Sequence, residues 1–336
     1  MENMDTKNLL KEIKTLPLDK ELYKKLFTDI VRVRVFEEET IQLFQNAKII
    51  GYLHPSIGNE AAEVGAAEAL AKEDIVFPTH RGHGFFVARG ADLGKLMAEL
   101  MGRQTGYCQG RGGDLHMAAP EVGIMQVQGI LGAQLPHAVG TAIAHKNMKN
   151  GKVTFCLFGD GAAGNGTFHE SLNLASIWKL PVVFGCINNG YAASFSFKKS
   201  TSVPTNAIRA VSYSMPGYDV DGRDVWQVYC ASKEAVDRAR AGEGPSLLQF
   251  NTFRWRGHDP NDDAPYRPKE ELAQWEQNDP VKIGIKKIME EKILEQADID
   301  RIYDDAKKEV KASVDFGLAQ PMPTFEDYLA DVEGKY

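Results

Sequence analysis

Apolar residues recur at helical spacing through the first fifty residues. In DKELYKKLFTDIVRVRVFEEETIQLFQNAKI they fall near one face of a helix, at Leu22, Leu26, Ile30, Val33, Phe36, Ile41 and Phe44. The preceding stretch, MENMDTKNLLKEIKTL, is polar and also has the pattern of an amphipathic helix. The pattern predicts an N-terminal helical arm over residues 1–50, with one long helix that lies on the body of the protein.

Short apolar runs with the length of buried strands follow in the middle of the chain. There are three such runs, separated by helical patterns: VTFCLF, VVFGCI and SLLQFNTF, at 153–158, 182–187 and 246–253. Strands that alternate with helices favour an α/β fold with a parallel sheet and helices on both faces. We expect this domain to span residues 51–268, and the charged helical pattern of 269–336 predicts a C-terminal helical extension.

Two of the expected helices consist largely of small side chains. NEAAEVGAAEALAKED begins at residue 59 and GAQLPHAVGTAIAHKN at residue 132, and alanine and glycine faces allow close packing against other helices. Between them lies a glycine-dense polar stretch at 101–123, and a loop of that length in a compact domain usually carries function.

Composition narrows the functional classes. The chain has 336 residues and a formal net charge of -7 without a long run of like charges, so neither nucleic acid nor a membrane surface is an expected partner. It has no apolar run of the roughly 20 residues that span a bilayer and no secretory signal, so we expect a cytoplasmic protein. The four cysteines lie too far apart in the sequence to suggest a disulfide or a zinc site.

A glycine-rich stretch, GDGAAGNG at 159–166, follows the first predicted strand and contains the spacing G-x-G-x-x-G. This spacing is typical of dinucleotide-binding folds, in which the backbone approaches a pyrophosphate closely. Asp160 opposes that interpretation, because a carboxylate about 4 Å from one phosphate charge costs about 4 kcal/mol at an effective dielectric constant of about 20, and the helix dipole offsets only about 1 kcal/mol. A cation between them would remove the conflict.

The spacing of Asp160 and Asn189 supplies a site for such a cation. The two are 29 residues apart, the length of a strand, helix and strand unit, so both are expected at the carboxyl ends of neighbouring parallel strands. A carboxylate and an amide oxygen are hard ligands suited to magnesium that retains a diphosphate. The sequence therefore predicts a metal-diphosphate site at this edge of the sheet.

Two alternatives stay open at this point. Asp160 alone would also suit a helix cap, and Asn188 with Asn189 would suit a turn. The G-x-G-x-x-G spacing alone would suit a nicotinamide-dependent dehydrogenase, although the acidic residue that binds a ribose about 20 residues further on is missing.

The whole stretch GDGAAGNGTFHESLNLASIWKLPVVFGCINNGYA resembles the alpha subunit of the decarboxylating component of 2-oxo acid dehydrogenase complexes, a family that depends on thiamine diphosphate. The resemblance continues through GYLHPSIGNEAAEVG, THRGHG, GRGGDLHM, GILGAQLPHAVG and FRWRGHDPNDDAPYRP, and so covers about residues 20–330. FHESLN, NNGYA and SMPGYDVDG resemble the acetoin-cleaving branch more than the pyruvate or branched-chain branches. The resemblance implies the thiamine-diphosphate-binding fold.

The resemblance also implies roles for individual residues. It places Mg²⁺ on Asp160, on Asn189 and on the backbone carbonyl of Tyr191. The residues implied to contact thiamine diphosphate elsewhere are His80, Arg81, Gly129, Leu131, Gly159, Gly161, Ala162 and His258. His54 is expected near the reacting carbon as a substrate-orienting or proton-transfer group, and we take His54 and His258 as the candidate catalytic residues.

The other histidines are given no such role. His116, His137, His145 and His169 are expected to pack or to lie at the surface, while His83 stays open between packing and function. The segment RWRGHDPNDDAPYRP would become a mobile lid over the diphosphate.

Some positions depart from the family pattern. Ile187 replaces a glutamate that commonly precedes the paired asparagines, and Gly190 stands where pyruvate-type and branched-chain relatives carry an arginine. The second departure weakens a pyruvate or branched-chain assignment and leaves more of the phosphate charge to Arg81 and His258. Asp259 stands where some relatives carry a phosphorylated serine, so kinase regulation at that position is not expected.

The resemblance finally implies partners. We find no candidate for the glutamate that contacts the pyrimidine ring, and a single-chain enzyme would need a much longer sequence. We therefore expect a beta subunit, an alpha2-beta2 heterotetramer, and acyl transfer to a lipoyl-bearing acyltransferase core. The expected substrate is acetoin, or alternatively pyruvate or a branched-chain 2-oxo acid, and a non-catalytic thiamine-diphosphate-binding homologue is the remaining alternative.

Overall fold

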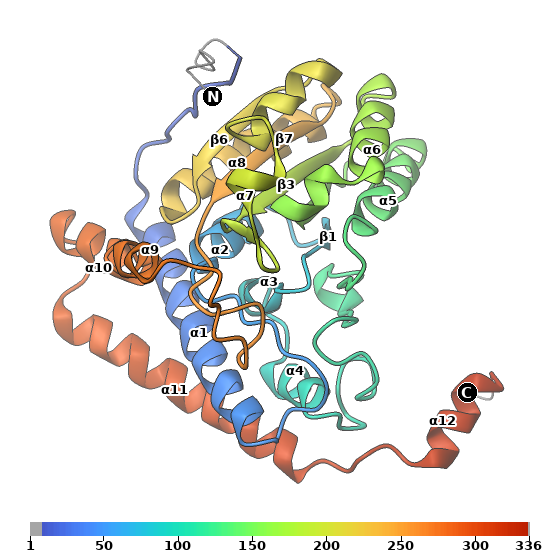
Figure 1. Ribbon diagram of the computed structural model, residues 1–336, viewed down its shortest axis with the longest axis vertical. Coiled ribbons are helices and arrows are strands. Elements are labelled where there is room, and N and C mark those ends of the chain that lie inside the picture. Colours follow the sequence, from blue (N-terminus) through green and yellow to red (C-terminus); the bar gives the residue numbers. More distant parts are fainter. Residues whose placement is uncertain (1–8, 335–336) are drawn as a thin grey trace.

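A parallel sheet of five strands forms the centre of the computed structural model, which describes residues 9–334 (Figure 1). Its strands run in the order β1 (Ile75–Phe77), β2 (Thr154–Gly159), β3 (Val182–Asn188), β7 (Ser246–Asn251) and β6 (Gly217–Asp221). All neighbouring pairs in this sheet are parallel. The carboxyl ends of β2, β3 and β7 therefore share one edge of the sheet.

Alternation of side chains along the central strands separates two apolar cores. On β2, Phe155 and Leu157 belong to one core while Cys156 and Phe158 belong to the other. Successive side chains of a strand point to opposite faces, so a continuously apolar strand buries both of its faces. The uninterrupted runs in the sequence thus correspond to strands that are covered on both sides.

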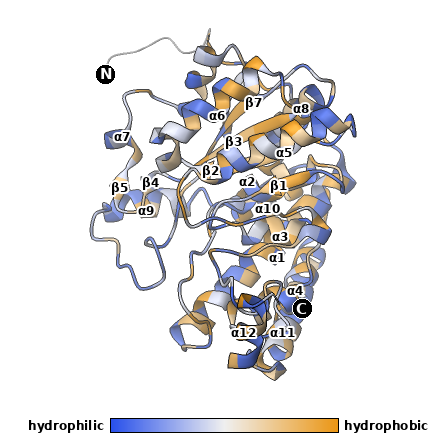
Figure 2. Cartoon of the chain, turned by 90° about the vertical axis from the view of Figure 1, so that its right-hand side faces the viewer, coloured by the Kyte–Doolittle hydropathy of each residue, from blue (hydrophilic) through white to orange (hydrophobic). Residues whose placement is uncertain are grey.

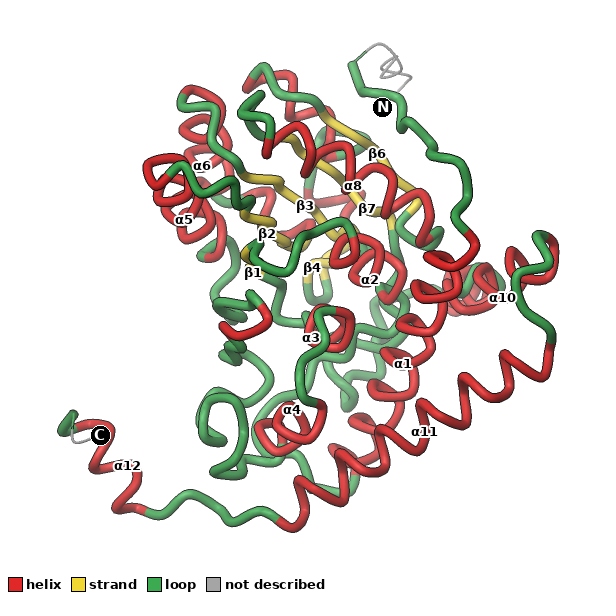
Figure 3. Tube along the Cα trace, turned by 180° about the vertical axis from the view of Figure 1, so that it is seen from behind, coloured by secondary structure: helices red, strands yellow, loops and turns green. Residues whose placement is uncertain are grey.

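Helices cover both faces of this sheet (Figure 3). On one face lie α2 (Glu60–Glu68) and α8 (Val225–Arg240), with the long helix α1 (Lys20–Gln45) over α2. The other face is covered by α5 (Gln134–Met148) and α6 (Gly166–Ile177). The predicted α/β fold with helices on both faces is therefore confirmed.

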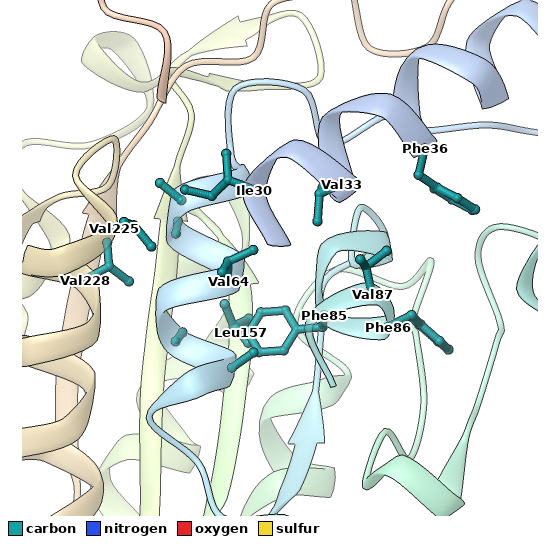
Figure 4. Packing of buried hydrophobic residues seen from close by; sticks show 14 of the residues in the cluster. Ile30, Val33, Phe36, Val64, Phe85, Phe86, Val87, Leu157, Val225 and Val228 are labelled. Atoms are coloured by element: carbon teal, nitrogen blue, oxygen red, sulfur yellow. The ribbon is translucent and has the colours of Figure 1, made fainter. Parts of the chain in front are cut away.

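Close approach of α2 and α8 depends on a glycine. A side chain at Gly65 would place its Cβ 2.8 Å from the backbone oxygen of Val225 and from Cγ1 of Val228. Figure 4 shows Val225 and Val228 beside α2, with Ile30 and Val64 in the same core. The small side chains that the sequence predicts for close helix packing serve that purpose here.

Other α-helices lie mostly below the sheet in the view of Figure 1. They are α3 (His83–Ala88), α4 (Leu93–Leu100), α9 (Lys269–Glu276), α10 (Pro280–Glu290), α11 (Gln296–Ala319) and α12 (Phe325–Val332). Figure 2 shows the hydrophobic residues gathered along the strands and the inner faces of the helices. No helix among residues 9–334 combines the length and the apolar character needed to cross a membrane.

Short elements connect these parts. They are the 3-10 helices η1 (Pro120–Val122), η2 (Asp160–Gly164) and η3 (Asn206–Tyr213), the helix α7 (Phe197–Ser200) and the antiparallel pair β4 (Tyr191–Ala192) and β5 (Phe195–Ser196). Both η2 and β4 directly follow ends of the central strands, so the chain changes direction where the candidate site was predicted.

The N-terminal helix is shorter than expected. It begins at Lys20, where the side chain of Asp19 accepts hydrogen bonds from the backbone N–H groups of Glu21 and Leu22. Residues 9–19 form no helix; instead the indole of Trp226 donates to the carbonyl of Leu16 at 3.2 Å. The expected amphipathic helix over residues 1–16 is therefore wrong for residues 9–16, and residues 1–8 lie outside the described part of the chain.

Two strands of the sheet were not predicted. β1 has only three residues, and β6 contains two aspartates in the sequence GYDVD. Neither offers the long apolar run that identifies β2, β3 and β7. Both are peripheral strands of the sheet, where shorter or more polar sequences are tolerated.

Arg34 joins three parts of the chain that are distant in sequence. Its guanidinium, buried on α1, donates to Glu60 at the start of α2 at 2.6 Å and to both oxygens of Asp279 at 2.9 and 3.0 Å. Asp279 is also the N-cap of α10. A buried arginine with two carboxylates thus links the N-terminal helix, the central domain and the C-terminal helices, and the division at residues 50 and 268 remains a prediction.

One carboxylate organises the glycine-dense loop. Glu99 is fully buried at the end of α4, and its Oε1 and Oε2 accept four backbone N–H bonds, from Cys108, Gly110, Gly112 and Gly113, at 2.7–3.0 Å. Hydrogen bonds to a charged acceptor are stronger than neutral ones. The loop therefore has a fixed backbone up to the residue before Asp114.

We expect Glu99→Gln to destabilise this loop by about 2 kcal/mol or more, because the amide nitrogen replaces an acceptor for buried N–H donors. Amide hydrogen exchange of residues 106–113 measures the effect. Glu121→Gln, at an exposed position, is the matched control and should leave exchange in the loop unchanged. Equal protection in both variants would contradict the role given to Glu99.

Candidate active site

A cavity of about 400 Å³ lies at the carboxyl ends of β2 and β3. Every residue that the sequence assigned to the cofactor, the metal or catalysis lines it: His54, His80, Arg81, Gly129, Leu131, Gly159, Asp160, Gly161, Ala162, Asn189, Tyr191 and His258. These residues come from six separate stretches of the chain. The structure brings them together; their individual roles remain proposals.

Strand register places the two expected metal ligands at the same level. Gly159, the last residue of β2, pairs with Ile187 on β3, so Asp160 and Asn189 follow neighbouring strand ends. Asp160 is buried, and its Oδ2 has no hydrogen-bond partner among the described residues. Burial raises the pKa of Asp160 to about 6. A buried carboxylate oxygen without a partner is the donor that a hard cation would satisfy.

The helix-cap alternative fails at Asp160. Helix α6 has Asn165 as its N-cap, and the side chain of Asn165 accepts from the N–H of Thr167 at 3.2 Å. The turn alternative holds in part, because Asn188 Oδ1 accepts from the N–H of Gly190 at 3.1 Å. Asn189 Oδ1 accepts only a long 3.4 Å bond from the N–H of Tyr191. Asp160 and Asn189 therefore keep oxygen atoms available for a ligand.

Two buried arginines face the same cavity without a carboxylate partner. Arg81 donates to the carbonyls of Pro55 and His258, at 3.0 and 2.6 Å, and forms no ion pair with any described acidic residue. Arg254 likewise donates to the carbonyl of Ala193 and to the hydroxyl of Tyr266, both at 2.8 Å. Burial and the neighbouring Arg254 lower the pKa of Arg81 to about 9. Uncompensated buried cations favour an anionic ligand, and guanidinium groups suit phosphate.

Arg254 was not singled out by any motif, although it lies in the quoted segment FRWRGHDP. Arg254 supplies a second positive charge to the cavity, although the arginine that other members of the family carry at the position of Gly190 is missing here. Its position in the cavity depends on the fold of 254–268, where Asp262 accepts hydrogen bonds from the N–H of His258 and the hydroxyl of Tyr266, both at 2.6 Å. Those bonds shape the segment expected to be a lid, and its mobility remains a prediction.

Three histidines form an aromatic cluster at the cavity. The ring centre of His54 lies 5.0 Å from that of His80 and 4.9 Å from that of His258. Burial and the charge of Arg81 lower the pKa of His80 well below its usual value, and the same causes lower the pKa of His258 to about 4. His80 and His258 are therefore neutral near pH 7, so Arg81 and Arg254 are the positively charged side chains that line the cavity.

A second missed residue, Asp114, lies behind this cluster. Its Oδ2 is 2.6 Å from Nδ1 of His54, and its Oδ1 is 3.0 Å from Nε2 of His83. The sequence feature that could have pointed to Asp114 was its position in the glycine-dense loop, between Gly113 and Leu115. His83, which the sequence left open, is thus a buried neighbour of the site and does not line the cavity.

Gly161 is required by the path of the chain. A side chain there would place its Cβ 2.6 Å from Cβ of Ala192, which belongs to β4. The backbone of η2 therefore approaches the segment after β3 closely. None of the four histidines expected to be uninvolved, His116, His137, His145 and His169, lines this cavity.

Comparison with known proteins decides the family. A model of the dehydrogenase E1 component matches residues 28–326. The chain belongs to the dehydrogenase E1 component family. Membership of this family implies thiamine diphosphate as the cofactor, and so resolves the glycine motif against a nicotinamide-binding domain.

Relatives in the E1 family are similar over nearly the whole chain. The alpha subunit of acetoin:2,6-dichlorophenolindophenol oxidoreductase from Bacillus subtilis is 38% identical over 315 residues, covering 93% of both chains. The protein of the same name from Cupriavidus necator is 39% identical over 322 residues, covering 96% of this chain and 97% of the relative. The alpha subunit of the pyruvate dehydrogenase E1 component from Zymomonas mobilis is 36% identical over 320 residues, covering 95% and 90%.

The raised pKa of Asp160 predicts a pH-dependent effect of Asp160→Asn on the metal-free chain. The folded pKa of about 6 lies above the usual 3.8, so ionising Asp160 lowers stability as pH rises from about 4 to 6. Without metal, the variant should be more stable than the wild type by up to about 3 kcal/mol at pH 8 and equal to it near pH 4. Urea denaturation at both pH values measures the difference, and an effect independent of pH would contradict it.

Proposed function

We propose that this chain is the alpha subunit of a thiamine-diphosphate-dependent dehydrogenase component that cleaves acetoin, or decarboxylates a 2-oxo acid, and passes the acyl group to a lipoyl carrier. One observation carries the proposal: a partnerless buried oxygen of Asp160 shares a cavity with the buried, unpaired Arg81 and Arg254. Opposite charges held apart without protein partners suit a metal ion bound to a diphosphate. The relatives named above support the reaction class.

The residues present fit a magnesium diphosphate. Asp160 Oδ2, Asn189 Oδ1 and the carbonyl of Tyr191 would bind Mg²⁺, an oxygen set that magnesium prefers. Arg81 and Arg254 would bind phosphate oxygens. The backbone of the turn after β2 would lie close to the diphosphate, at Gly159, Gly161 and Ala162. The pyrimidine side of the coenzyme would contact Gly129 and Leu131.

When bound, thiamine diphosphate supplies a nucleophilic carbon for attack on the carbonyl of the substrate. The chain's own contribution is to bind the diphosphate, orient the substrate and handle protons. His54 and His258 line the cavity with His80 beside them, and the Nδ1 atoms of the first two are held by Asp114 and Arg81. The low pKa of His258 keeps it neutral, so it can donate one hydrogen bond and accept another.

The site is incomplete without a partner. Asp160 is the only carboxylate among the described residues that line the cavity, so none of residues 9–334 offers a glutamate for the pyrimidine. Ile130 and Leu131 remain 69% and 52% exposed at its rim. The alpha-subunit names of the relatives imply a beta subunit, and we propose that it covers this rim in an alpha2-beta2 heterotetramer that docks on a lipoyl-bearing acyltransferase core.

Acetoin is the proposed substrate because the two acetoin-type relatives match the chain at 38% and 39% identity. Pyruvate or a branched-chain 2-oxo acid is the second candidate, favoured by the pyruvate-type relative at 36%. The cytoplasmic location expected from the sequence stays a prediction.

Co-expression with the cognate beta subunit tests the function. The purified pair should reduce an artificial electron acceptor with acetoin or a 2-oxo acid when thiamine diphosphate and Mg²⁺ are present. The chain purified alone should show no turnover, because the pyrimidine side of the site is missing. Turnover by the single chain, or none by the pair with any of these substrates, would contradict the proposal.

The metal assignment has its own test. Asp160→Ala should weaken binding of thiamine diphosphate to the pair in the presence of Mg²⁺ by at least about 100-fold, since an ion bound to diphosphate loses its charged ligand. Titration calorimetry with and without Mg²⁺ measures this. Asp304→Ala, at an exposed position on α11, is the control and should bind as the wild type does. Unchanged affinity in Asp160→Ala would exclude Asp160 as the ligand.

A further inference from the structure

His54 is held from behind by a buried carboxylate. Its Nδ1 lies 2.6 Å from Oδ2 of Asp114, and both side chains are at least nine-tenths buried. The arrangement continues inward: Asp114 Oδ1 lies 3.0 Å from Nε2 of His83, within ion-pair distance although not aligned as a hydrogen bond. His83 Nδ1 lies 3.0 Å from Oε1 of Glu37 on α1. Four polar residues thus run from the core to the cavity.

The charges along this row are fixed by their neighbours. Burial opposes charge on both central groups, but Glu37 and Asp114 raise the pKa of His83 well above its usual value. The hydrogen bond from His54 and the charge of His83 likewise outweigh burial and lower the pKa of Asp114 to about 2. Burial and the nearby Glu37 raise the pKa of the adjacent Glu63 well above its usual value. Asp114 is therefore ionised with a protonated His83 behind it.

An ionised Asp114 determines which nitrogen of His54 carries the proton. A carboxylate only accepts, so the proton lies on Nδ1 and the lone pair on Nε2. Among the described residues Nε2 has no hydrogen-bond partner, and His54 lines the cavity. The two other rings that face it, His80 and His258, are neutral near pH 7. His54 therefore presents a proton acceptor to the substrate space.

We propose that Asp114 is a positioning residue that holds His54 as a proton acceptor, and that the substrate is an α-hydroxy ketone whose hydroxyl proton His54 removes. His83 and Glu37 fix the orientation of Asp114. This inference rests on the proposed function and chooses between its substrates.

The chemistry of the two substrate classes differs in its need for such a group. When the carbon–carbon bond of an α-hydroxy ketone breaks, the hydroxyl-bearing carbon becomes an aldehyde and its hydroxyl proton passes to Nε2 of His54. The electron pair of the broken bond would remain with the former carbonyl carbon, and accepting it is the chemistry that bound thiamine diphosphate would supply. A 2-oxo acid loses carbon dioxide from a carboxylate that has no proton to remove. A dedicated acceptor therefore favours the hydroxy ketone.

The charge of the cavity agrees with a neutral substrate. Arg81 and Arg254 are the only lysine or arginine side chains among the described residues that line it, and the proposed function assigns both to phosphate. Near His54 the chain offers neutral imidazoles, Tyr52 and Leu115. This part of the cavity has no cation left to bind a substrate carboxylate.

Asp114→Asn in the alpha-beta complex tests the inference. Carbethoxylation by diethyl pyrocarbonate at fixed pH, followed by mass spectrometry, reports the reactivity of the ring of His54, which is the only histidine between residues 46 and 79. Loss of the carboxylate should slow this modification, because Asp114 no longer fixes the tautomer that presents the Nε2 lone pair. In the same variant kcat/KM should fall about 100-fold or more for acetoin and by less than about tenfold for pyruvate, because general-base catalysis contributes about 100-fold or more.

Two further variants make the test decisive. Asp114→Glu retains the carboxylate and should restore part of the activity on acetoin, whereas Asp304→Asn on α11 should change neither readout. His83→Gln leaves Asp114 in place but removes the group that orients it, so it should slow the modification of His54 less than Asp114→Asn does, which provides a second route if Asp114→Asn does not fold. An unchanged rate of modification in both Asp114→Asn and His83→Gln would overturn the positioning role.

Equal losses on acetoin and pyruvate would overturn the substrate assignment. The modification measurement needs no turnover, so it distinguishes this inference from the proposed function. A wild-type pair that is inactive on all substrates would refute the proposed function, while slower modification of His54 in Asp114→Asn would still report the pairing of Asp114 with His54.

Discussion

Asp160 leaves one carboxylate oxygen buried without a hydrogen bond at the end of β2, while Arg81 and Arg254 lie buried on the same cavity without a carboxylate. Direct pairing of these groups would offset part of the cost of burying their charges, yet the fold holds them apart. We therefore propose that the cavity takes a ligand that supplies positive charge to Asp160 and negative charge to the arginines. The roles proposed for the surrounding residues depend on that separation.

The positions of the proposed metal ligands could be predicted because both residues come directly after strands that the sequence reveals. Asp160 and Asn189 come directly after apolar runs that are buried on both faces, and the carboxyl ends of neighbouring parallel strands meet at one edge. The α/β class followed from the same runs. β1 and β6 escaped prediction because three residues, or a sequence with two aspartates, carry no apolar pattern of their own.

The residues that were missed depend on contacts between distant parts of the sequence. Asp114 is 60 residues from His54, and Arg254 is 61 residues from Ala193, whose carbonyl accepts its hydrogen bond. Local pattern does not reveal which acid will lie under which histidine. The loop that carries Asp114 is shaped by Glu99, whose four backbone hydrogen bonds replace the regular structure that the glycines prevent. Only the folded chain shows that a loop rich in glycine can be this well ordered.

Arg34 also limits how this protein can be recombined with its relatives. Its guanidinium serves an acid on α2 and the acid that caps α10, and leaving a buried charge without its partner typically costs about 3–5 kcal/mol. That cost is a large fraction of the roughly 5–15 kcal/mol that stabilises an ordinary domain. A chimera that exchanges only one end of the chain separates the arginine from its acids unless the residues at all three positions match. The terminal helices therefore cannot be exchanged independently of the central domain.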